Sequence, residues 1–394
     1  MSKDAISFHK KLQGKIFVGS KIKKITKKNL QLIYTPGVAA VCKEIFNHPN
    51  TRYQLTTKAN NVAIITDGTR ILGLGNIGPD AALPVMEGKS VLYREYGNIS
   101  AFPICLDTRD RKQIVETVKA IAPVFGAINL EDIESPKVLD ISHELEESLD
   151  IPVFHDDRHG TSVVVLAALL NSLIIVNKKI SEIKVVIVGA GSAGYGIGKL
   201  LYFAGCKNII ILDSKGAIYK GRKESMNKYK NEIAEFTNKY ERGYLDNVIV
   251  GADVFIGVSG IKNLLKTKMI KKMNQNAIVF ALTNPYPEIN PTLAKNAGAR
   301  IVATGSFSYE NKVNNALVFP YIMRAILDLK IKKISLDMLY TVAVAIANTI
   351  PKNKIGENNI IPEINNKFLQ NKITSAIRKQ SKTKNTKRTQ GIFL

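Results

Sequence analysis

Two acidic pairs precede a glycine-rich turn in this chain of 394 residues. The pairs are Glu131-Asp132 in INLEDI and Asp156-Asp157 in FHDDRHGT, and the turn is GAGSAG at residues 189–194. Four carboxylates crowded at strand ends would repel one another unless a cation lay among them, and all-oxygen ligands suit Mg²⁺ or Mn²⁺ better than zinc. These residues therefore predict a divalent metal site beside a dinucleotide site.

The glycine turn lies in the sequence context that dinucleotide binding requires. An apolar strand at residues 185–188 leads into it, a helix is expected after it, and a second strand ends at Asp213, 24 residues after Gly189 (213 − 189 = 24). Gly189 permits the tight turn, Gly191 lets the backbone approach the pyrophosphate, and Gly194 allows close helix packing. The expected cofactor-binding residues are Gly189, Ala190, Gly191, Ser192, Ala193, Gly194 and Asp213.

The identity of the dinucleotide is less strongly indicated. Asp213 would bind the ribose hydroxyls of the adenosine and repel a 2′-phosphate, which favours NAD. Lys215, Arg222 and Lys223 follow closely in the sequence and weaken that preference. The predicted cofactors are therefore NAD, with NADP as the alternative, and Mg²⁺ or Mn²⁺.

Segments typical of strands and helices alternate along the chain. Strands are expected at residues 62–68 and 101–107, with a helix after Glu87 between them, and a helix at residues 161–176 would lead into the second half. This alternation predicts an α/β fold with parallel sheets, in which ligands gather beyond the carboxyl ends of the strands. We expect an N-terminal α/β substrate and metal domain at residues 1–160 and a doubly wound, Rossmann-type NAD(P)-binding domain at residues 161–320. A helical C-terminal segment would follow at residues 321–378, and residues 379–394 would form a basic, disordered tail.

Composition and charge restrict the class of protein. The formal net charge is +23, and lysines cluster at residues 21–28 and in the tail. No recognition helix or aromatic platform accompanies them, so nucleic-acid binding is not expected as the main role. The apolar stretches are shorter than a bilayer span and the N-terminus lacks the apolar segment of a signal peptide, so we expect a cytoplasmic protein without a membrane partner. The three cysteines indicate neither a disulfide framework nor a zinc ribbon.

Several local strings resemble the malic enzymes, in their short bacterial and archaeal form. The resemblance runs in the family's order from about residue 32 to about residue 326, and it leaves the basic tail unmatched. The strings are YTPGVA (34–39), TDGTRILGLGNIGP (66–79), PVMEGKSVL (84–92), INLEDI (128–133), FHDDRHGT (154–161), GAGSAG, LTNP (282–285) and VNN (313–315).

The resemblance implies a reaction and a set of roles. The reaction would be the metal-dependent oxidative decarboxylation of L-malate to pyruvate and CO₂, with reduction of NAD(P). Lys89 would take the proton of the C2 hydroxyl, which requires a pKa near neutrality that burial and a nearby cation both promote. Tyr34 would protonate C3 of enolpyruvate, and Asp156 would tune Lys89. The resemblance assigns Glu131, Asp132 and Asp157 to the metal.

The same resemblance implies the substrate-binding residues and the assembly. Arg70 would grip a substrate carboxylate with its bidentate guanidinium. Asn284 and Asn315 would bind the substrate, and Asn284 would also contact the cofactor. The family further implies a homodimer or a larger homo-oligomer.

Two other classes of protein are alternatives. An amino-acid dehydrogenase would combine a similar pair of domains with a lysine but would need no metal. A non-catalytic nucleotide-binding or nucleic-acid-binding protein could keep the fold without the chemistry. Taken singly, Tyr34 could be a core aromatic before a turn, and each acidic pair could cap a helix.

Overall fold

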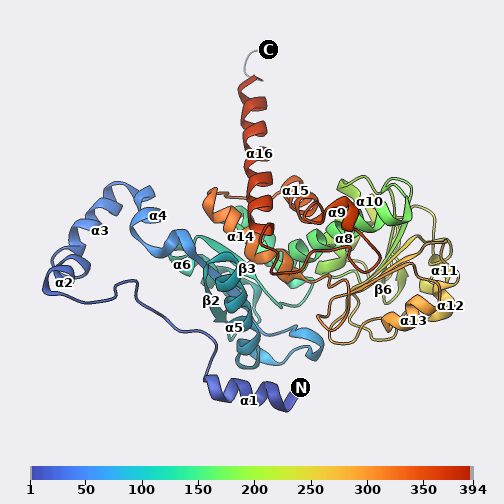
Figure 1. The fold of residues 1–394 in the computed structure, drawn as a ribbon, viewed down its shortest axis with the longest axis horizontal. Coiled ribbons are helices and arrows are strands. Elements are labelled where there is room, and N and C mark those ends of the chain that lie inside the picture. The colour runs from blue at the N-terminus through green and yellow to red at the C-terminus, as the bar shows by residue number, and fades with distance from the viewer. Residues whose placement is uncertain (1, 391–394) are drawn as a thin grey trace.

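Two sheets form the centre of the fold in the computed structural model, which describes the backbone of residues 2–390 (Figure 1). The first sheet has four parallel strands in the order β2-β1-β3-β4. Its central strands are buried along their whole length, as expected of a sheet covered by helices. The strands are β1 (Asn61–Thr66), β2 (Ser100–Cys105), β3 (Ala127–Leu130) and β4 (Val153–His155).

The second sheet has six strands in the order β10-β9-β8-β5-β6-β7. All neighbours are parallel except β7, which pairs antiparallel to β6 at the edge. The strands are β5 (Lys184–Val188), β6 (Asn208–Asp213), β7 (Gly216–Ala217), β8 (Val254–Gly257), β9 (Ile278–Ala281) and β10 (Ile301–Thr304). The helices of this half are α9 (Ser192–Phe203), α10 (Lys228–Phe236), α11 (Leu245–Val248), α12 (Thr267–Ile270) and α13 (Pro291–Asn296). The predicted α/β fold with a Rossmann-type half is confirmed.

Helix α8 (Thr161–Val176) runs from the first sheet to the second, as the sequence predicts. Twelve of its residues are buried, so its apolar composition reflects a place in the core. Together with the preceding turn η5 (Asp156–Gly160) it is long and apolar enough to cross a membrane, but 78% of that stretch is buried inside the fold.

The helices of the first half are α5 (Gly78–Gly97), α6 (Arg111–Ile121) and α7 (Lys137–Ser148). Helix α5 begins well before Glu87, where the sequence analysis expected it to start. Pro79 is its second residue, where the missing N–H of proline costs nothing, so the Gly-Pro pair opens this helix instead of marking a loop.

The C-terminal segment consists of α14 (Phe319–Asp328), α15 (Leu336–Ala347) and α16 (Leu369–Gln390). Helix α16 packs Leu369, Ile373 and Ile377 into the core and then continues as a helix to Gln390. The disorder expected from residue 379 is therefore wrong as far as residue 390, because this run of lysine, threonine and glutamine contains no glycine or proline to end a helix. Residues 391–394 lie outside the described part of the chain.

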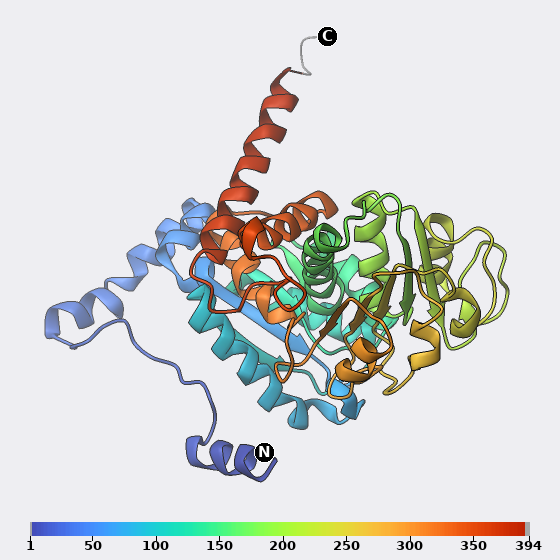
Figure 2. The same cartoon turned by 45° about the vertical axis from the view of Figure 1, so that its right-hand side comes forward.

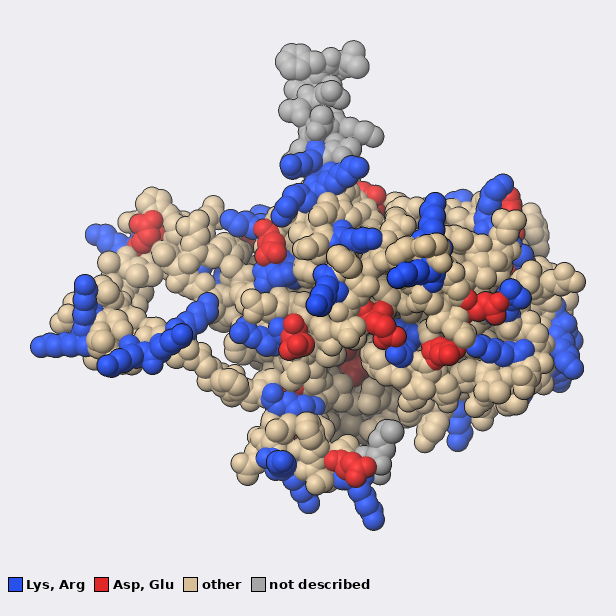
Figure 3. All heavy atoms as spheres, in the orientation of Figure 1, with Lys and Arg blue, Asp and Glu red and all other residues tan. Residues whose placement is uncertain are grey.

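An N-terminal arm, residues 16–56, stands away from the two sheets (Figures 1 and 2). Helices α2 (Lys27–Ile33) and α3 (Val38–Asn47) bury no residue of their own, and α4 (Arg52–Leu55) returns the chain to β1. Before the arm, α1 (Ser2–Leu12) ends near α5, where the backbone N–H of Lys15 donates to Glu87 over 3.2 Å. The lysine cluster of residues 21–28 lies on this arm, and several basic side chains project from the arm in Figure 3.

Candidate active site

Lys89 lies at the centre of a buried carboxylate cluster. Its Nζ is 2.6 Å from Oε2 of Glu131, which follows β3, and 3.0 Å from Oδ2 of Asp156, which follows β4. Burial alone would lower the pKa of Lys89, but the two carboxylates outweigh it and hold that pKa above its ordinary value. The structure thus corrects the expectation that burial brings the pKa of Lys89 toward neutrality. With these partners Lys89 is a cation.

Asp156 also links the two halves of the chain. Its Oδ2 accepts a hydrogen bond of 2.9 Å from Nδ2 of Asn315, and Oδ1 of Asn315 accepts one of 3.1 Å from the hydroxyl of Thr161. The second carboxylate oxygen of Asp156, Oδ1, is buried without a hydrogen-bond partner. A buried acceptor of this kind is costly unless a bound group meets it.

Two residues that the sequence analysis missed support Glu131. The hydroxyl of Tyr93 donates to Oδ1 of Asn129 over 2.6 Å, and Nδ2 of Asn129 donates to Oε2 of Glu131 over 2.9 Å. The ring of Phe319 contacts both Tyr93 and the Lys89 ammonium, which lies 4.0 Å from the ring centre. Spacing could have revealed both residues, because Tyr93 is one helical turn after Lys89 and Asn129 is two strand residues before Glu131.

Arg70 joins the metal-binding candidates to the glycine turn. Its Nη1 lies 3.7 Å from Oδ2 of Asp157 and 3.4 Å from the hydroxyl of Ser192. The backbone N–H of Arg70 donates to the carbonyl oxygen of Asp132 over 3.0 Å. Residues predicted to bind the substrate, the metal and the cofactor therefore lie together at the junction of the two halves. They are Arg70, Asp157 and Ser192, in that order.

The donor chemistry of Glu131, Asp132 and Asp157 fits a divalent cation. Burial raises the pKa of all three carboxyls, and mutual repulsion adds to the rise, most clearly for Asp132, whose pKa is about 7 beside Asp157. A cation among them would remove that repulsion. Among the described residues no three side chains of His, Cys, Asp or Glu stand close enough to hold an ion as they are arranged. To bind a cation, Glu131 would have to turn away from Lys89, and Asp157 would have to turn away from Arg70.

A pocket of about 780 Å³ adjoins this cluster along the carboxyl ends of the second sheet. Gly189, Ala190, Gly191 and Ala193 of the glycine turn line it, together with Asp213 and Arg70. Gly189 has φ +118°, and a Cβ there would lie 2.5 Å from the carbonyl oxygen of Val258. A Cβ on Gly194 would lie 1.8 Å from the carbonyl oxygen of Gly189. This turn therefore has the geometry that lets a dinucleotide approach the backbone at the start of α9.

The carboxylate of Asp213 is fully occupied by cationic and backbone donors. Its Oδ1 accepts from the Lys215 N–H over 2.8 Å and from Nη1 of Arg222 over 2.9 Å, and its Oδ2 accepts from Nη2 of Arg222 and from Lys230 over 2.7 Å. Although burial opposes it, these donors hold the pKa of Asp213 at about 2. Lys230 was not identified from the sequence, because it belongs to α10, 17 residues after Asp213 (230 − 213 = 17), and to no motif.

The remaining predicted site residues are Asn284 and Tyr34. Asn284 follows β9, and its Nδ2 donates to the carbonyl oxygen of Gly305 over 3.4 Å. Tyr34 ends α2 on the N-terminal arm with 67% of its surface exposed. The arm that carries Tyr34 leads away from the sheets (Figure 1), and the role of Tyr34 as the acid for C3 of enolpyruvate stays a prediction.

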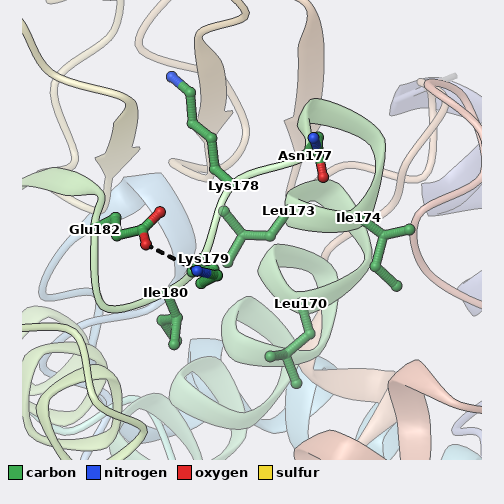
Figure 4. A pocket seen from close by; sticks show the side chains of 8 residues that line it. All are labelled: Leu170, Leu173, Ile174, Asn177, Lys178, Lys179, Ile180 and Glu182. Atoms are coloured by element: carbon green, nitrogen blue, oxygen red, sulfur yellow. Dashed lines mark ion pairs between the residues drawn. The ribbon is translucent and has the colours of Figure 1, made fainter.

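A second hollow lies at the other end of α8, lined by Leu170, Leu173, Ile174 and residues 177–180 and 182 (Figure 4). Its lining residue nearest to Asp157 along the chain is Leu170, 13 residues later (170 − 157 = 13), which is about 20 Å at the rise of an α-helix. Lys179 and Glu182 pair over 3.2 Å at its rim. It shares no residue with the dinucleotide pocket and has no part in the site.

The fold and the two adjoining sites define a dinucleotide-dependent α/β enzyme. Comparisons with known proteins give the family. Residues 13–116 match the N-terminal domain of malic enzyme, and residues 159–381 match the NAD-binding domain of malic enzyme. The chain belongs to the malic enzyme family.

Individual relatives agree over most of the chain. The NAD-dependent malic enzyme of Geobacillus stearothermophilus is 49% identical over 92% of this chain and 76% of its own. The NADP-dependent malic enzyme of Escherichia coli is 44% identical over 88% of this chain and 46% of its own. The crystal structure of the NAD-dependent malic enzyme of Thermotoga maritima superposes with a TM-score of 0.91 at 45% identity, over 95% of this chain and 98% of its own. The predicted family is confirmed.

Proposed function

We propose that this chain oxidises and decarboxylates L-malate to pyruvate and CO₂ while reducing NAD(P), with the residue roles given below. The observation that carries the proposal is Lys89 between Glu131 and Asp156, beside a pocket built on the glycine turn. An amino-acid dehydrogenase would not need the crowded carboxylates, and the family match favours malate as the substrate.

Lys89 is the base of the oxidation step. Its amine would take the proton of the C2 hydroxyl, which requires that the carboxylates of Glu131 and Asp156, which raise its pKa, hold it less strongly than they do here. Asp156 keeps Lys89 in place through Oδ2. Asn315, which donates a hydrogen bond to Asp156, would bind the substrate.

Glu131, Asp132 and Asp157 would hold Mg²⁺ or Mn²⁺. A bound divalent cation would supply Lewis-acid polarisation of the C2 oxygen during loss of CO₂. Arg70 stands between Asp157 and Ser192 and presents its guanidinium to a substrate carboxylate. Asn284 is assigned to the substrate and the cofactor.

Tyr34 protonates C3 of enolpyruvate in the site of a second copy of this chain. The arm that carries it leads away from the sheets of its own chain (Figure 1) and exposes large apolar side chains such as Phe17, Val18 and Phe46. These two features support a homodimer or larger assembly with exchanged arms.

NAD is the favoured cofactor because Asp213 lines the dinucleotide pocket at the end of β6, the position at which an acidic residue would face the adenosine ribose. Arg222 and Lys230 neutralise that carboxylate, so NADP is expected to be accepted more weakly rather than excluded. The experiment that tests the proposal is cofactor reduction with L-malate, comparing NAD with NADP, and Mn²⁺ or Mg²⁺ with excess chelator. Metal-dependent reduction would support the proposal, and no reduction with either cofactor would contradict it.

A further inference from the structure

Glu288 is a fully buried carboxylate that no part of the proposed mechanism uses. Its exposed fraction is 0%, and it lies in the loop after β9, four residues beyond Asn284. The hydroxyl of Thr283 donates to its Oε1 and the backbone N–H of Thr283 donates to its Oε2 over 3.2 Å. The backbone N–H of Ser259, after β8, donates to Oε1 over 3.4 Å. One side chain thus ties together the loops that leave β8 and β9.

Further contacts fix the same two loops. The hydroxyl oxygen of Thr283 accepts from the backbone N–H of Gly260 over 3.1 Å, and the Leu265 N–H donates to the carbonyl oxygen of Glu288 over 3.0 Å. A Cβ on Gly257, the last residue of β8, would lie 2.3 Å from Cδ of Glu288. The carboxylate therefore fills the space that a side chain at Gly257 would occupy.

The two loops meet both parts of the active site. Val258, Ser259 and Ile261 of the β8 loop line the dinucleotide pocket. Asn284 and Pro285 of the β9 loop lie against Gly73 in the first half of the chain, where a Cβ would be 2.6 Å from Cδ of Pro285. A shift of either loop would move a wall of the cofactor pocket or the junction with the substrate domain.

We infer that Glu288 is a positioning residue that holds the Ser259 loop and the Asn284 loop in register, and so sets the affinity for cofactor and for malate. Only the expected effect on the affinity for malate rests on the proposed function. A carboxylate suits the task because it offers acceptors only, and it faces three donors. A glutamine would turn its amide hydrogens toward one of those donors and lose that contact.

Asp253 supplies a matched control at the opposite end of β8. It is also a buried carboxylate, 6% exposed, and it accepts from the Lys184 N–H over 2.7 Å, from Asn274 over 2.9 Å and from Lys178. Its partners lie at the amino ends of the strands, away from the pocket. Asp253→Asn should therefore destabilise the fold without changing the site.

The test compares Glu288→Gln with Asp253→Asn and the unaltered chain. We would measure NADH binding by fluorescence, KM and kcat for malate, and the melting temperature. Glu288→Gln should raise the Kd for NADH and the KM for malate by about tenfold each, the size expected when a supporting contact of a binding site is lost. Asp253→Asn should lower the melting temperature and change both constants less than about twofold.

Equal constants in Glu288→Gln and Asp253→Asn would overturn the inference, whatever the melting temperatures. If Glu288→Gln does not fold, Thr283→Val removes the hydroxyl between Glu288 and Gly260 and should raise the same two constants in the same direction. NADH binding distinguishes a failure of the role of Glu288 from a failure of the proposed function. Tight NADH binding without malate turnover in the unaltered chain would contradict the proposed function and leave the role of Glu288 testable.

Discussion

Lys89 and Glu131 form a buried ion pair, with 2.6 Å between Nζ and Oε2, and their side chains are 6% and 12% exposed. The oxygen that faces Lys89 is also the one that Asn129 fixes by a hydrogen bond. The lysine proposed as the base and a carboxylate proposed for the metal are therefore direct partners, so binding of a cation by Glu131 would loosen its hold on Lys89. The first prediction concerns that lysine.

Lys89→Met should lower kcat for malate by at least about a thousandfold, because a positioned general base contributes on the order of 10² to 10⁴ and the carboxylate cluster also loses its cation. The measurement is steady-state turnover. Lys58→Met is the control, since Lys58 is also buried but donates to the carbonyl oxygens of Ala122, Pro123 and Phe125 at the far end of the sheet. Lys58→Met should lose stability and keep kcat. Unchanged turnover in Lys89→Met would remove Lys89 as the base.

Asp157→Ala should weaken Mn²⁺ binding by at least about tenfold, because it removes a candidate ligand and one of the repelling carboxylates. Free Mn²⁺ can be followed by electron paramagnetic resonance, without reference to turnover. The pKa of Asp132 should also fall in this variant, since Asp157 is its largest neighbouring cause of elevation. Mn²⁺ affinity equal to that of the unaltered chain would exclude Asp157 as a ligand.

Tyr34→Phe mixed with Lys89→Met should recover activity after subunit exchange. Each variant alone is expected to be inactive, but a mixed dimer with exchanged arms has one site that contains both native residues. Random exchange then restores about a quarter of the unaltered activity. No recovery from verified mixed dimers would show that Tyr34 does not act in the partner's site.

Lys230→Gln should raise the KM for NADP by about tenfold or more and change that for NAD much less. Lys230 is the accessible cation beside Asp213, whereas Arg222 is buried against it. Without Lys230 the carboxylate of Asp213 is balanced by Arg222 alone, so the site loses the excess positive charge that would attract a 2′-phosphate. Lys220→Gln is the matched control, because Lys220 pairs with Glu235 on an exposed surface. Equal effects on NAD and NADP would contradict this role.

The lowered pKa of Asp213 predicts that the stability of the fold depends on pH in the acidic range. Its pKa is about 2 in the folded chain and 3.8 in the reference state, so the folded state favours the ionised form. The stabilisation from Arg222 and Lys230 should be complete above about pH 4 to 5 and disappear as the pH falls toward 2. Denaturant unfolding of Asp213→Asn and the unaltered chain should therefore converge on acidification. A difference that stays constant from pH 6 to about pH 3 would contradict the shift.

Most residues of the candidate site could be predicted from the sequence, because strand ends and motifs are local features. Residues 128–133 and 154–161 each end a strand of one parallel sheet, so their carboxylates had to meet at one edge. The same logic found the glycine turn and Asp213. It also found helix α8 at residues 161–176.

The remaining features depend on contacts that no local pattern encodes. Tyr34 lies in a recognisable motif, but no local pattern encodes the direction of the arm that carries it. Lys230 and Glu288 act through loops that the fold brings together, and the spacing of Tyr93 from Lys89 suggests its place but not its hydrogen bond to Asn129. The helix at residues 379–390 continues α16, and a basic composition rich in threonine does not reveal it.

The most direct test of the central claim is the stoichiometry of the reaction with L-malate and Mn²⁺. Reduced cofactor, pyruvate and CO₂ would be measured in the same sample, with chelator as the control. The account predicts one pyruvate and one CO₂ for each cofactor reduced, and no product with chelator. Cofactor reduction that yields oxaloacetate without CO₂, or turnover indifferent to the chelator, would contradict it.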